Sequence, residues 1–372
     1  MANLILVINP GATSTKVALY EGTHELCSES LAHPAEELAK YREINDQLEM
    51  RKAAVYDFLK RNGRTVADLD GIAARGGCVA ELETGAYVVD DHFTELARDT
   101  INPHAANLAI MIANEMRREC NVPAFAYDLV CGTGKPEEVY TLSGMPEISR
   151  PFLTHVLNSR AVAFEQARKD GTSVYEQTYI VCHLGGGCST NLLVNGTIKD
   201  LFGDDENCFT PERSGGVPCR KLVRLCFSGQ YTEKEVQKLL KGESGLKGYL
   251  GTTDIRDVVQ MIEEGDEFAE VVFDAMVLQL AKNIGAIATV VDGNVDKIIL
   301  TGGIAYCEPF TSAVIKRVQF IAPVSVIPGT FEMEALAGGV DRVLRGEEKA
   351  RVYTGGPMVD APSRSRVRGM EA

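Results

Sequence analysis

Two stretches of this chain have the same layout, and together they restrict the folds open to it. Residues 6–22 and residues 180–196 each read as an apolar strand, a turn rich in glycine and hydroxyl residues, and a second strand. Gly11 falls on Gly185 and Leu19 falls on Leu193 without a gap. Turns of this kind can direct backbone N–H groups and short hydroxyls at a phosphate. The pattern predicts two similar domains that face one another across a polyphosphate.

Length and composition fit this organisation. A chain of 372 residues is too long to form one ordinary hydrophobic core, so two domains are expected. Its composition, with 45% hydrophobic and 24% charged residues, is typical of a globular protein. We expect no membrane span, because no apolar run approaches the ~18–20 residues required. We also expect no export, since the N-terminus enters a strand directly. The scattered cysteines predict reduced thiols in a cytoplasmic protein, and the net charge of −14 argues against nucleic acid as a partner.

Three glycine turns are the candidate phosphate and nucleoside sites. They lie at Gly11, at Gly185-Gly186-Gly187 and at Thr301-Gly302-Gly303. The chain has no Walker A sequence and no Gly-x-Gly-x-x-Gly after a strand, so P-loop and Rossmann interpretations lose their main support. A single glycine turn is more often structural, but two matching copies and a third turn favour nucleotide binding.

Three cations beside these turns are candidate phosphate ligands. Lys16 lies close enough to touch a terminal phosphate, with an exposed strand lysine as the equally weighted alternative. Arg75 and Arg213 stand in loops next to glycines, where they suit a double anion, namely a transferring phosphoryl and a carboxylate acceptor. Structural ion pairs with Glu81 or Glu212 are the competing explanation. We favour a functional role for both arginines.

Two acids and two histidines complete the candidate set. Asp128 and Glu332 stand at strand ends, where either could position Mg²⁺ through water. An ordinary acid in the first turn of a helix is the alternative for Glu332. His155 and His183 occupy unusual places, and His183 is the stronger candidate because it adjoins three glycines.

Taken together, these residues resemble the acetate and butyrate kinase family, within the acetate-and-sugar-kinase, heat-shock-chaperone and actin superfamily. The resemblance is collinear from Leu4 to about Arg345. The first hairpin resembles that family's opening phosphate motif, residues 183–189 its second phosphate motif and residues 299–304 its adenosine motif. The segments at 75–77, 102–107, 210–215 and 326–329 are most similar to butyrate and branched-chain carboxylate kinases.

The resemblance implies an α/β fold of two duplicated ribonuclease-H-like (actin-like ATPase) domains flanking a nucleotide cleft. The N-terminal domain would comprise residues 1–150, with the first phosphate motif and the acyl site, and a C-terminal helix at about 333–350 would complete it. Residues 151–332 would form the C-terminal domain, with the second phosphate motif and the adenosine motif. Residues 351–372, rich in Gly, Pro, Ser and Arg, predict a mobile tail.

The resemblance also implies roles for individual residues. Arg75 and Arg213 would bind the acyl substrate and the migrating phosphoryl, Asp128 would be the essential active-site aspartate, and His155 and His183 would lie near the transfer site. Asn9 and Glu332 would hold the metal, with Glu334 as the alternative acid. Phosphate and nucleotide binding would fall to Asn9, Gly11, Ser14, Lys16, Gly185, Gly186, Gly187, Ser189, Gly302, Gly303 and Ile304. Cys188 replaces what is usually an aliphatic residue, and its role is left open.

The activity implied is that of an ATP-dependent carboxylate kinase, which converts butanoate and ATP to butanoyl phosphate and ADP by direct in-line transfer. Its cofactors would be ATP/ADP and Mg²⁺, and its other partner a short-chain carboxylate. Isobutyrate, acetate and propionate stay open as substrates. A non-kinase ATPase of the actin or chaperone type is the second class of function. The resemblance also implies at least a homodimer.

Overall fold

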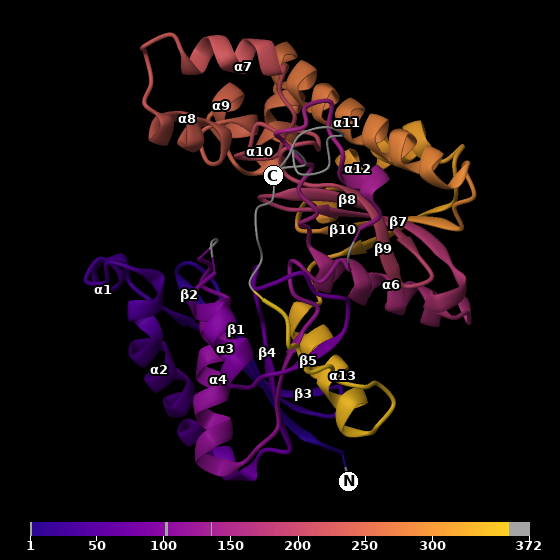
Figure 1. Ribbon diagram of the computed structural model, residues 1–372. Coiled ribbons are helices and arrows are strands. Elements are labelled where there is room, and N and C mark those ends of the chain that lie inside the picture. Colours follow the sequence, from indigo (N-terminus) through magenta and orange to yellow (C-terminus); the bar gives the residue numbers. More distant parts are fainter. Residues whose placement is uncertain (1, 101–102, 135, 357–372) are drawn as a thin grey trace, which may run out of the picture. The chain divides into compact units, whose positions relative to one another are not determined.

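The computed structural model describes residues 2–100, 103–134 and 136–356, which form two compact units (Figure 1). The first unit is assembled from two parts of the sequence, Met1–Arg150 and Phe331–Ala372. The second unit is continuous and runs from Pro151 to Thr330. The boundaries expected from the sequence, after residues 150 and 332, lie close to these positions.

The first unit is built on a six-stranded sheet in the order β3-β2-β1-β4-β6-β5. Its first three strands form an antiparallel meander, β4 and β6 continue in parallel with β1, and β5 closes the edge antiparallel to β6. The strands are β1 (Leu4–Pro10), β2 (Ser14–Glu21), β3 (His24–Ala32), β4 (Gly71–Ala74), β5 (Ala86–Val88) and β6 (Ala124–Tyr127).

Helices cover both faces of this sheet. α4 (Asn107–Cys120) and α13 (Glu332–Leu344) each contact β1 and β4, and Figure 1 shows them on opposite sides. α13 therefore returns the end of the chain to the first unit. The remaining helices of this unit are α1 (Ala35–Leu38), α2 (Leu48–Arg61), α3 (Asp91–Arg98) and α5 (Glu138–Thr141), with the 3₁₀ turns η1 (Ile44–Gln47) and η2 (Val66–Asp68).

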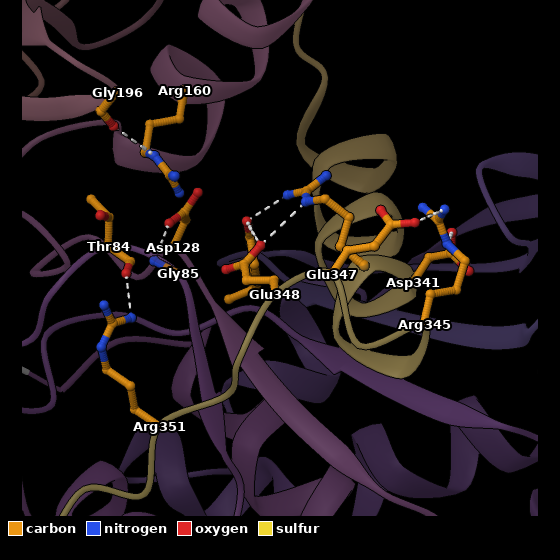
Figure 2. Close-up of polar contacts among 12 residues, drawn as sticks. Thr84, Gly85, Asp128, Arg160, Gly196, Asp341, Arg345, Glu347, Glu348 and Arg351 are labelled. Carbon is orange, nitrogen blue, oxygen red and sulfur yellow. Dashed lines mark hydrogen bonds and ion pairs between the residues drawn. The ribbon is translucent and has the colours of Figure 1, made fainter. Parts of the chain in front are cut away.

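The segment after α13 extends the edge of the same sheet. The backbone N–H of Arg351 donates to the carbonyl of Ala86 at 2.9 Å, and that of Val88 donates to the carbonyl of Arg351 at 2.8 Å. The Arg351 side chain donates to the carbonyl of Thr84 (Figure 2). Residues 351–356 are thus held by hydrogen bonds, which differs from the mobile tail expected from composition. Residues 357–372 of that predicted tail lie outside the described residues.

The second unit repeats the plan with a five-stranded sheet in the order β11-β10-β7-β8-β9. α6 (Val156–Asp170) contacts β7 and β10, and α11 (Glu267–Ala288) contacts β7, β8 and β9 from the other face (Figure 1). The strands are β7 (Thr178–Leu184), β8 (Cys188–Val194), β9 (Thr197–Phe202), β10 (Lys297–Gly302) and β11 (Val324–Pro328). The other helices are α7 (Cys219–Cys226), α8 (Glu233–Leu240), α9 (Gly245–Leu250), α10 (Ile255–Glu263) and α12 (Glu308–Val318), with η3 (Val174–Glu176), η4 (Thr289–Val291) and η5 (Ile304–Tyr306).

The two hairpins are equivalent in topology but not in length. In the first, Asn9 pairs with Lys16, whereas in the second His183 pairs with Ser189, one residue earlier than a gapless match requires. The register irregularity with the next strand moves by the same amount, from Leu19/Tyr20 to Leu192/Leu193. The sequence match without a gap is therefore wrong for the second strand, because the triple-glycine turn is one residue tighter.

The apolar helix α11 belongs to the core of the second unit. By length and composition alone, Glu267–Val291 could cross a membrane, with a mean hydropathy of 1.5. Half of its apolar window is nevertheless buried inside the protein, and Met276, Val277 and Leu280 are completely enclosed by the second core. The core helix of a globular protein passes the same test, so the finding is weak evidence for a membrane.

Candidate active site

In the first unit, the candidate metal and phosphate residues lie around the end of β1. Asn9 and Lys16 are directly paired across β1 and β2, so their side chains leave the same face of the sheet. The Asn9 side-chain amide donates to Oε2 of Glu332 at 2.9 Å. The structure therefore brings together the pair expected to hold a metal, although 323 residues separate them in sequence.

Arg75 lies beside this pair because β4 runs parallel to β1. Its backbone N–H donates to the carbonyl of Ile8, and its side chain is almost buried. The guanidinium lies 3.7 Å from Oε1 of Glu332 and donates to the carbonyl of Asp128 at 3.2 Å. Its carboxylate partner in the first unit is therefore Glu332, and the sequence did not identify this pair.

Asp128 is buried at the end of β6, and its backbone has a conformation that is unusual for a residue other than glycine. Its φ is 42°, in the left-handed region that Asp tolerates better than most residues. Its Oδ1 accepts a hydrogen bond from the backbone N–H of Gly85 at 2.7 Å (Figure 2). Asp128 thus fixes the loop before β5 and offers its carbonyl to Arg75.

His104 is a neighbour of Arg75 that the sequence did not select. Burial and then the positive charge of Arg75 lower the pKa of His104. A Cβ on Gly77 would lie 3.0 Å from the Cβ of His104, a tight contact that would require a small shift of this neighbour. The N–H of Gly77 donates to Oδ1 of Asn107, which fixes the glycine loop to the start of α4.

In the second unit, both candidate histidines meet at the second hairpin. The rings of His155 and His183 stack with their centroids 4.1 Å apart. Nδ1 of His155 lies 3.0 Å from Oγ of Ser189, which pairs with His183 across β7 and β8. The Asn158 amide donates to Nδ1 of His183 at 2.9 Å, which places the proton of a neutral ring on Nε2. Asn158, on α6, carried no motif by which sequence could find it.

Arg213 is held by an acid that the sequence did not predict. Its guanidinium forms an ion pair with Asp204, rather than with Glu212. The other carboxylate oxygen of Asp204, Oδ1, is buried without a hydrogen-bond partner among the described residues. A Cβ on Gly187 would lie 2.5 Å from Nη1 of Arg213, so the third glycine of the turn makes space for this pair.

The second unit has a pocket of about 570 Å³ that is lined by glycines from two of the predicted nucleotide turns. Gly185, Gly186, Gly303 and Ile304 line it, and Asp254 and Arg256 form part of its wall. A hydrogen bond from Arg256 lowers the pKa of Asp254 to about 2. Gly185, Gly186, Gly303 and Ile304 are predicted site residues, whereas residues 253–256 carried no motif in the sequence.

Gly302, a predicted nucleotide residue, and Cys188, whose role the sequence left open, do not line this pocket. Gly302 has a φ of 93°, and a Cβ there would lie 2.3 Å from the carbonyl oxygen of Leu184, so its role is in the backbone. Cys188 is completely buried, which leaves it out of reach of ligands. Within the described ranges, no group of three or more His, Cys, Asp or Glu residues could hold a metal ion.

Comparison with known proteins identifies the family. A model described as the acetokinase family matches residues 155–322. Butyrate kinase 1 of Clostridium acetobutylicum is 44% identical over 352 residues, which cover 94% of this chain and 99% of the relative. Probable butyrate kinase 2 of Caldanaerobacter subterraneus is 41% identical over 351 residues, with the same shares covered.

Solved structures agree in fold. An acetate kinase from Porphyromonas gingivalis superposes with a TM-score of 0.74 at 17% identity, covering 92% of this chain and 100% of that one. A propionate kinase from Francisella tularensis gives 0.72 at 19% identity, covering 91% and 98%. The duplicated actin-like ATPase fold expected from the sequence is thereby confirmed. With relatives at this identity along nearly their whole length, the chain belongs to the acetokinase family and, within it, to the group of the butyrate kinases.

Proposed function

We propose that this kinase phosphorylates butyrate, converting butanoate and ATP to butanoyl phosphate and ADP. The names of its relatives support butyrate as the acceptor. The observation that supports phosphoryl transfer most directly is that Glu332 accepts a hydrogen bond from Asn9 and forms an ion pair with Arg75. It places a cation and a carboxylate together at the ends of β1 and β4, the edge at which α/β sheets bind ligands.

Phosphoryl transfer to a carboxylate requires the repulsion between two anions to be offset, and it does not require general acid–base catalysis. A carboxylic acid is already ionised at neutral pH, so no general base has to activate the acceptor. Two anions must instead come within bonding distance. We assign Arg75, Arg213 and Lys16 to offset this repulsion and to stabilise the charge on the equatorial phosphoryl oxygens. Transfer is direct and in line, without a phosphorylated enzyme.

The histidine pair contributes a hydrogen-bond donor. With Nδ1 of His183 occupied by Asn158, Nε2 carries the proton of the neutral ring and can donate it to a phosphoryl oxygen. His155, stacked on His183 and close to Ser189, fixes the orientation of the ring. We assign Asp128 a place beside Arg75, whose guanidinium it orients through its carbonyl.

The residues fit a magnesium ion. Mg²⁺ takes oxygen ligands, keeps several waters and usually binds one or two carboxylates together with substrate phosphates. Glu332 and Asn9 lie together, joined by a hydrogen bond from the Asn9 amide nitrogen, and the Glu332 carboxylate and the Asn9 amide oxygen would supply such ligands. Bound there with ATP, the ion would neutralise charge on the phosphates.

ATP is assigned to the glycine turns. We assign the adenosine to the pocket lined by Gly185, Gly303 and Ile304. We assign phosphate binding to the turn at Gly11 in the first unit and to the turn at Gly186 in the second. Ser14 and Ser189 supply hydroxyl donors next to those turns. We further propose that the enzyme acts in the cytoplasm and as at least a homodimer.

Acyl-hydroxamate formation tests the proposal. The purified chain is incubated with ATP, Mg²⁺ and hydroxylamine, together with straight and branched carboxylates of two to six carbons. We expect the highest kcat/KM with butyrate. A maximum at acetate, propionate or isobutyrate would retain the reaction and replace the substrate. ATP binding without any hydroxamate would contradict the carboxylate kinase assignment and favour an ATP-driven switch.

A further inference from the structure

Arg51 is completely buried although it is charged, and no sequence motif marks it. It lies on α2, is 0% exposed, and is the largest fully buried side chain among the described residues. Burial lowers its pKa, and no nearby carboxylate counters that effect. An arginine nevertheless keeps its proton in proteins, so Arg51 is a buried cation for which the described residues provide no acidic partner.

The guanidinium of Arg51 is instead satisfied by the turn between β1 and β2. Its Nη1 donates to the carbonyls of Gly11 and Ser14 at 2.9 and 3.0 Å, and its Nη2 donates to the carbonyl of Ala12 at 3.1 Å. Nε and Nη2 both donate to the side-chain oxygen of Gln47. The neutral acceptors satisfy the hydrogen bonds of Arg51 but leave its charge in place.

The same contacts determine where the N–H groups of the turn point. In a trans peptide, the carbonyl of one residue and the N–H of the next point in opposite directions, and no cis peptide occurs in the described residues. Because the carbonyls of Gly11 and Ala12 face Arg51, the N–H groups of Ala12 and Thr13 face away from it. Both residues are exposed. Neither N–H group has an acceptor within the part of the chain that the structure describes.

His33, a second buried group just after the end of β3, completes this arrangement. The carbonyl of Thr13 accepts from the backbone N–H of His33 at 2.8 Å, so this carbonyl also faces the protein. Nε2 of His33 lies 2.8 Å from Oγ1 of Thr15, which also accepts from Arg51. All four carbonyls from Gly11 to Ser14 are thus turned inwards. Two exposed N–H groups above a buried cation form an arrangement suited to an anion.

We propose that Arg51 is a positioning residue for the phosphate site: it holds the Gly11–Ser14 turn with its N–H groups outward, and its unneutralised charge supports the bound anion from below. The inference rests on the proposed function in assigning this turn to a phosphate of ATP. It adds a residue with no phosphate contact of its own, in a chain whose net charge of −14 opposes anion binding.

The first experiment removes the guanidinium group by the substitution Arg51→Ala and then adds guanidinium ion to the solution. In Arg51→Ala, we expect kcat/KM for ATP to fall by roughly 10², the size of effect typical for lost anion stabilisation, with KM for butyrate little changed. Added guanidinium ion should restore part of the loss. Arg61→Ala, on the exposed end of the same helix, is the control and should respond to neither change. A folded Arg51→Ala enzyme with unchanged ATP kinetics would overturn the proposal.

The second experiment keeps the fold and cancels the charge, which covers the case in which Arg51→Ala fails to fold. Gln47→Glu places a carboxylate where the guanidinium already makes hydrogen bonds at 2.9 and 3.1 Å. We expect unchanged or higher thermal stability and about tenfold weaker binding of Mg·ATP by calorimetry. Asn45→Asp adds the same charge to η1, at a side chain that donates an exposed hydrogen bond to the backbone carbonyl of Arg98 and none to Arg51, and this variant should bind Mg·ATP normally.

Equal Mg·ATP affinity in Gln47→Glu and the unaltered chain would show that the charge of Arg51 is not used, and would overturn the proposal. Calorimetry needs no carboxylate substrate. A failure of the proposed butyrate activity, seen as missing hydroxamate in the unaltered chain, is therefore distinguishable from a failure of this inference.

Discussion

At the scale of single residues, Glu332 holds two partners of different kinds. Its carboxylate accepts from the Asn9 amide and lies beside the Arg75 guanidinium. Glu332→Gln keeps the size of the side chain but removes the charge that both Arg75 and a metal would use. We expect kcat to fall by roughly 10² and the Mg²⁺ concentration for half-maximal rate to rise, measured by the hydroxamate assay across a magnesium titration.

Glu334→Gln is the matched control for this prediction. Glu334 lies in the same first turn of α13, is exposed, and was the alternative metal acid from the sequence. We expect its magnesium titration to match that of the unaltered enzyme. A magnesium effect in Glu334→Gln together with a normal response in Glu332→Gln would reverse the assignment.

His33 predicts a pH dependence of stability. Burial and the charge of Arg51 lower the pKa of His33 in the folded protein. As the pH falls below the unfolded value of about 6.5, the unfolded chain binds this proton first, so the folded state loses stability on that side. We expect the fall in unfolding free energy between pH 7.5 and pH 5.5 to be smaller in His33→Gln than in the unaltered chain.

Denaturant unfolding at both pH values measures this difference. His104, whose pKa is lowered in the same direction, is present in both proteins and cancels in the comparison. The same pH sensitivity with and without His33 would mean that other groups cause it.

Residues that we propose to touch ligands carry sequence signals that their supporting residues lack. Arg75 and Arg213 could be predicted as site residues from the sequence, because charged side chains close to glycines in loops are unusual. Arg51 and Asn158 lie inside helices, where their side chains look like ordinary surface residues until the fold shows them buried. Asp204 lies in a loop without a motif, and its pairing with Arg213 depends on tertiary structure. Local spacing could not have found these three.

At the scale of elements, Gly302, the last residue of β10, and Gly303, which follows it, have different tasks. Gly302 is held at a positive φ against the backbone of Leu184, whereas a Cβ on Gly303 would meet nothing within 4 Å. We expect Gly302→Ala to lower the unfolding free energy by about 1–3 kcal/mol or more, because backbone strain and a backbone clash act together. Gly303→Ala should stay within about 0.5 kcal/mol of the unaltered protein. Urea unfolding measures both.

The reverse order of stabilities would contradict the backbone role of Gly302. The added methyl group in Gly303→Ala would lie at the pocket that we propose for adenosine, so the Mg·ATP affinity of this variant is measured in parallel. Weaker nucleotide binding with normal stability would separate the ligand-facing glycine from the structural one.

Hairpins and their order were readable from sequence because apolar alternation and glycine turns are local signals. The register of the second hairpin was not. Three successive glycines leave no side chain to indicate how tightly the turn closes, and a one-residue change in the turn is invisible in a gapless alignment. The pairing of Leu184 with Cys188 therefore becomes visible only in the structure.

At the scale of the whole molecule, the path of the chain makes the first unit depend on its C-terminal part. Leu336 and Val340 of α13 are fully buried, and a Cβ on Gly71 of β4 would lie 2.9 Å from Leu344. Burying Leu336 and Val340 alone contributes about 3–6 kcal/mol, a large share of a typical stability of about 5–15 kcal/mol. Without α13, one face of β1 and β4 would lose this cover.

We therefore expect three fragments to behave differently. Residues 151–330 alone should unfold cooperatively on heating, because that unit has its own sheet and core. Residues 1–150 alone should aggregate or lack a thermal transition. The same residues joined by a Gly/Ser linker to residues 331–356 should regain one, since both α13 and the strand-like contact of Arg351 return. Circular dichroism melts compare the three, and a cooperative transition in residues 1–150 alone would show that the returning helix is dispensable for folding.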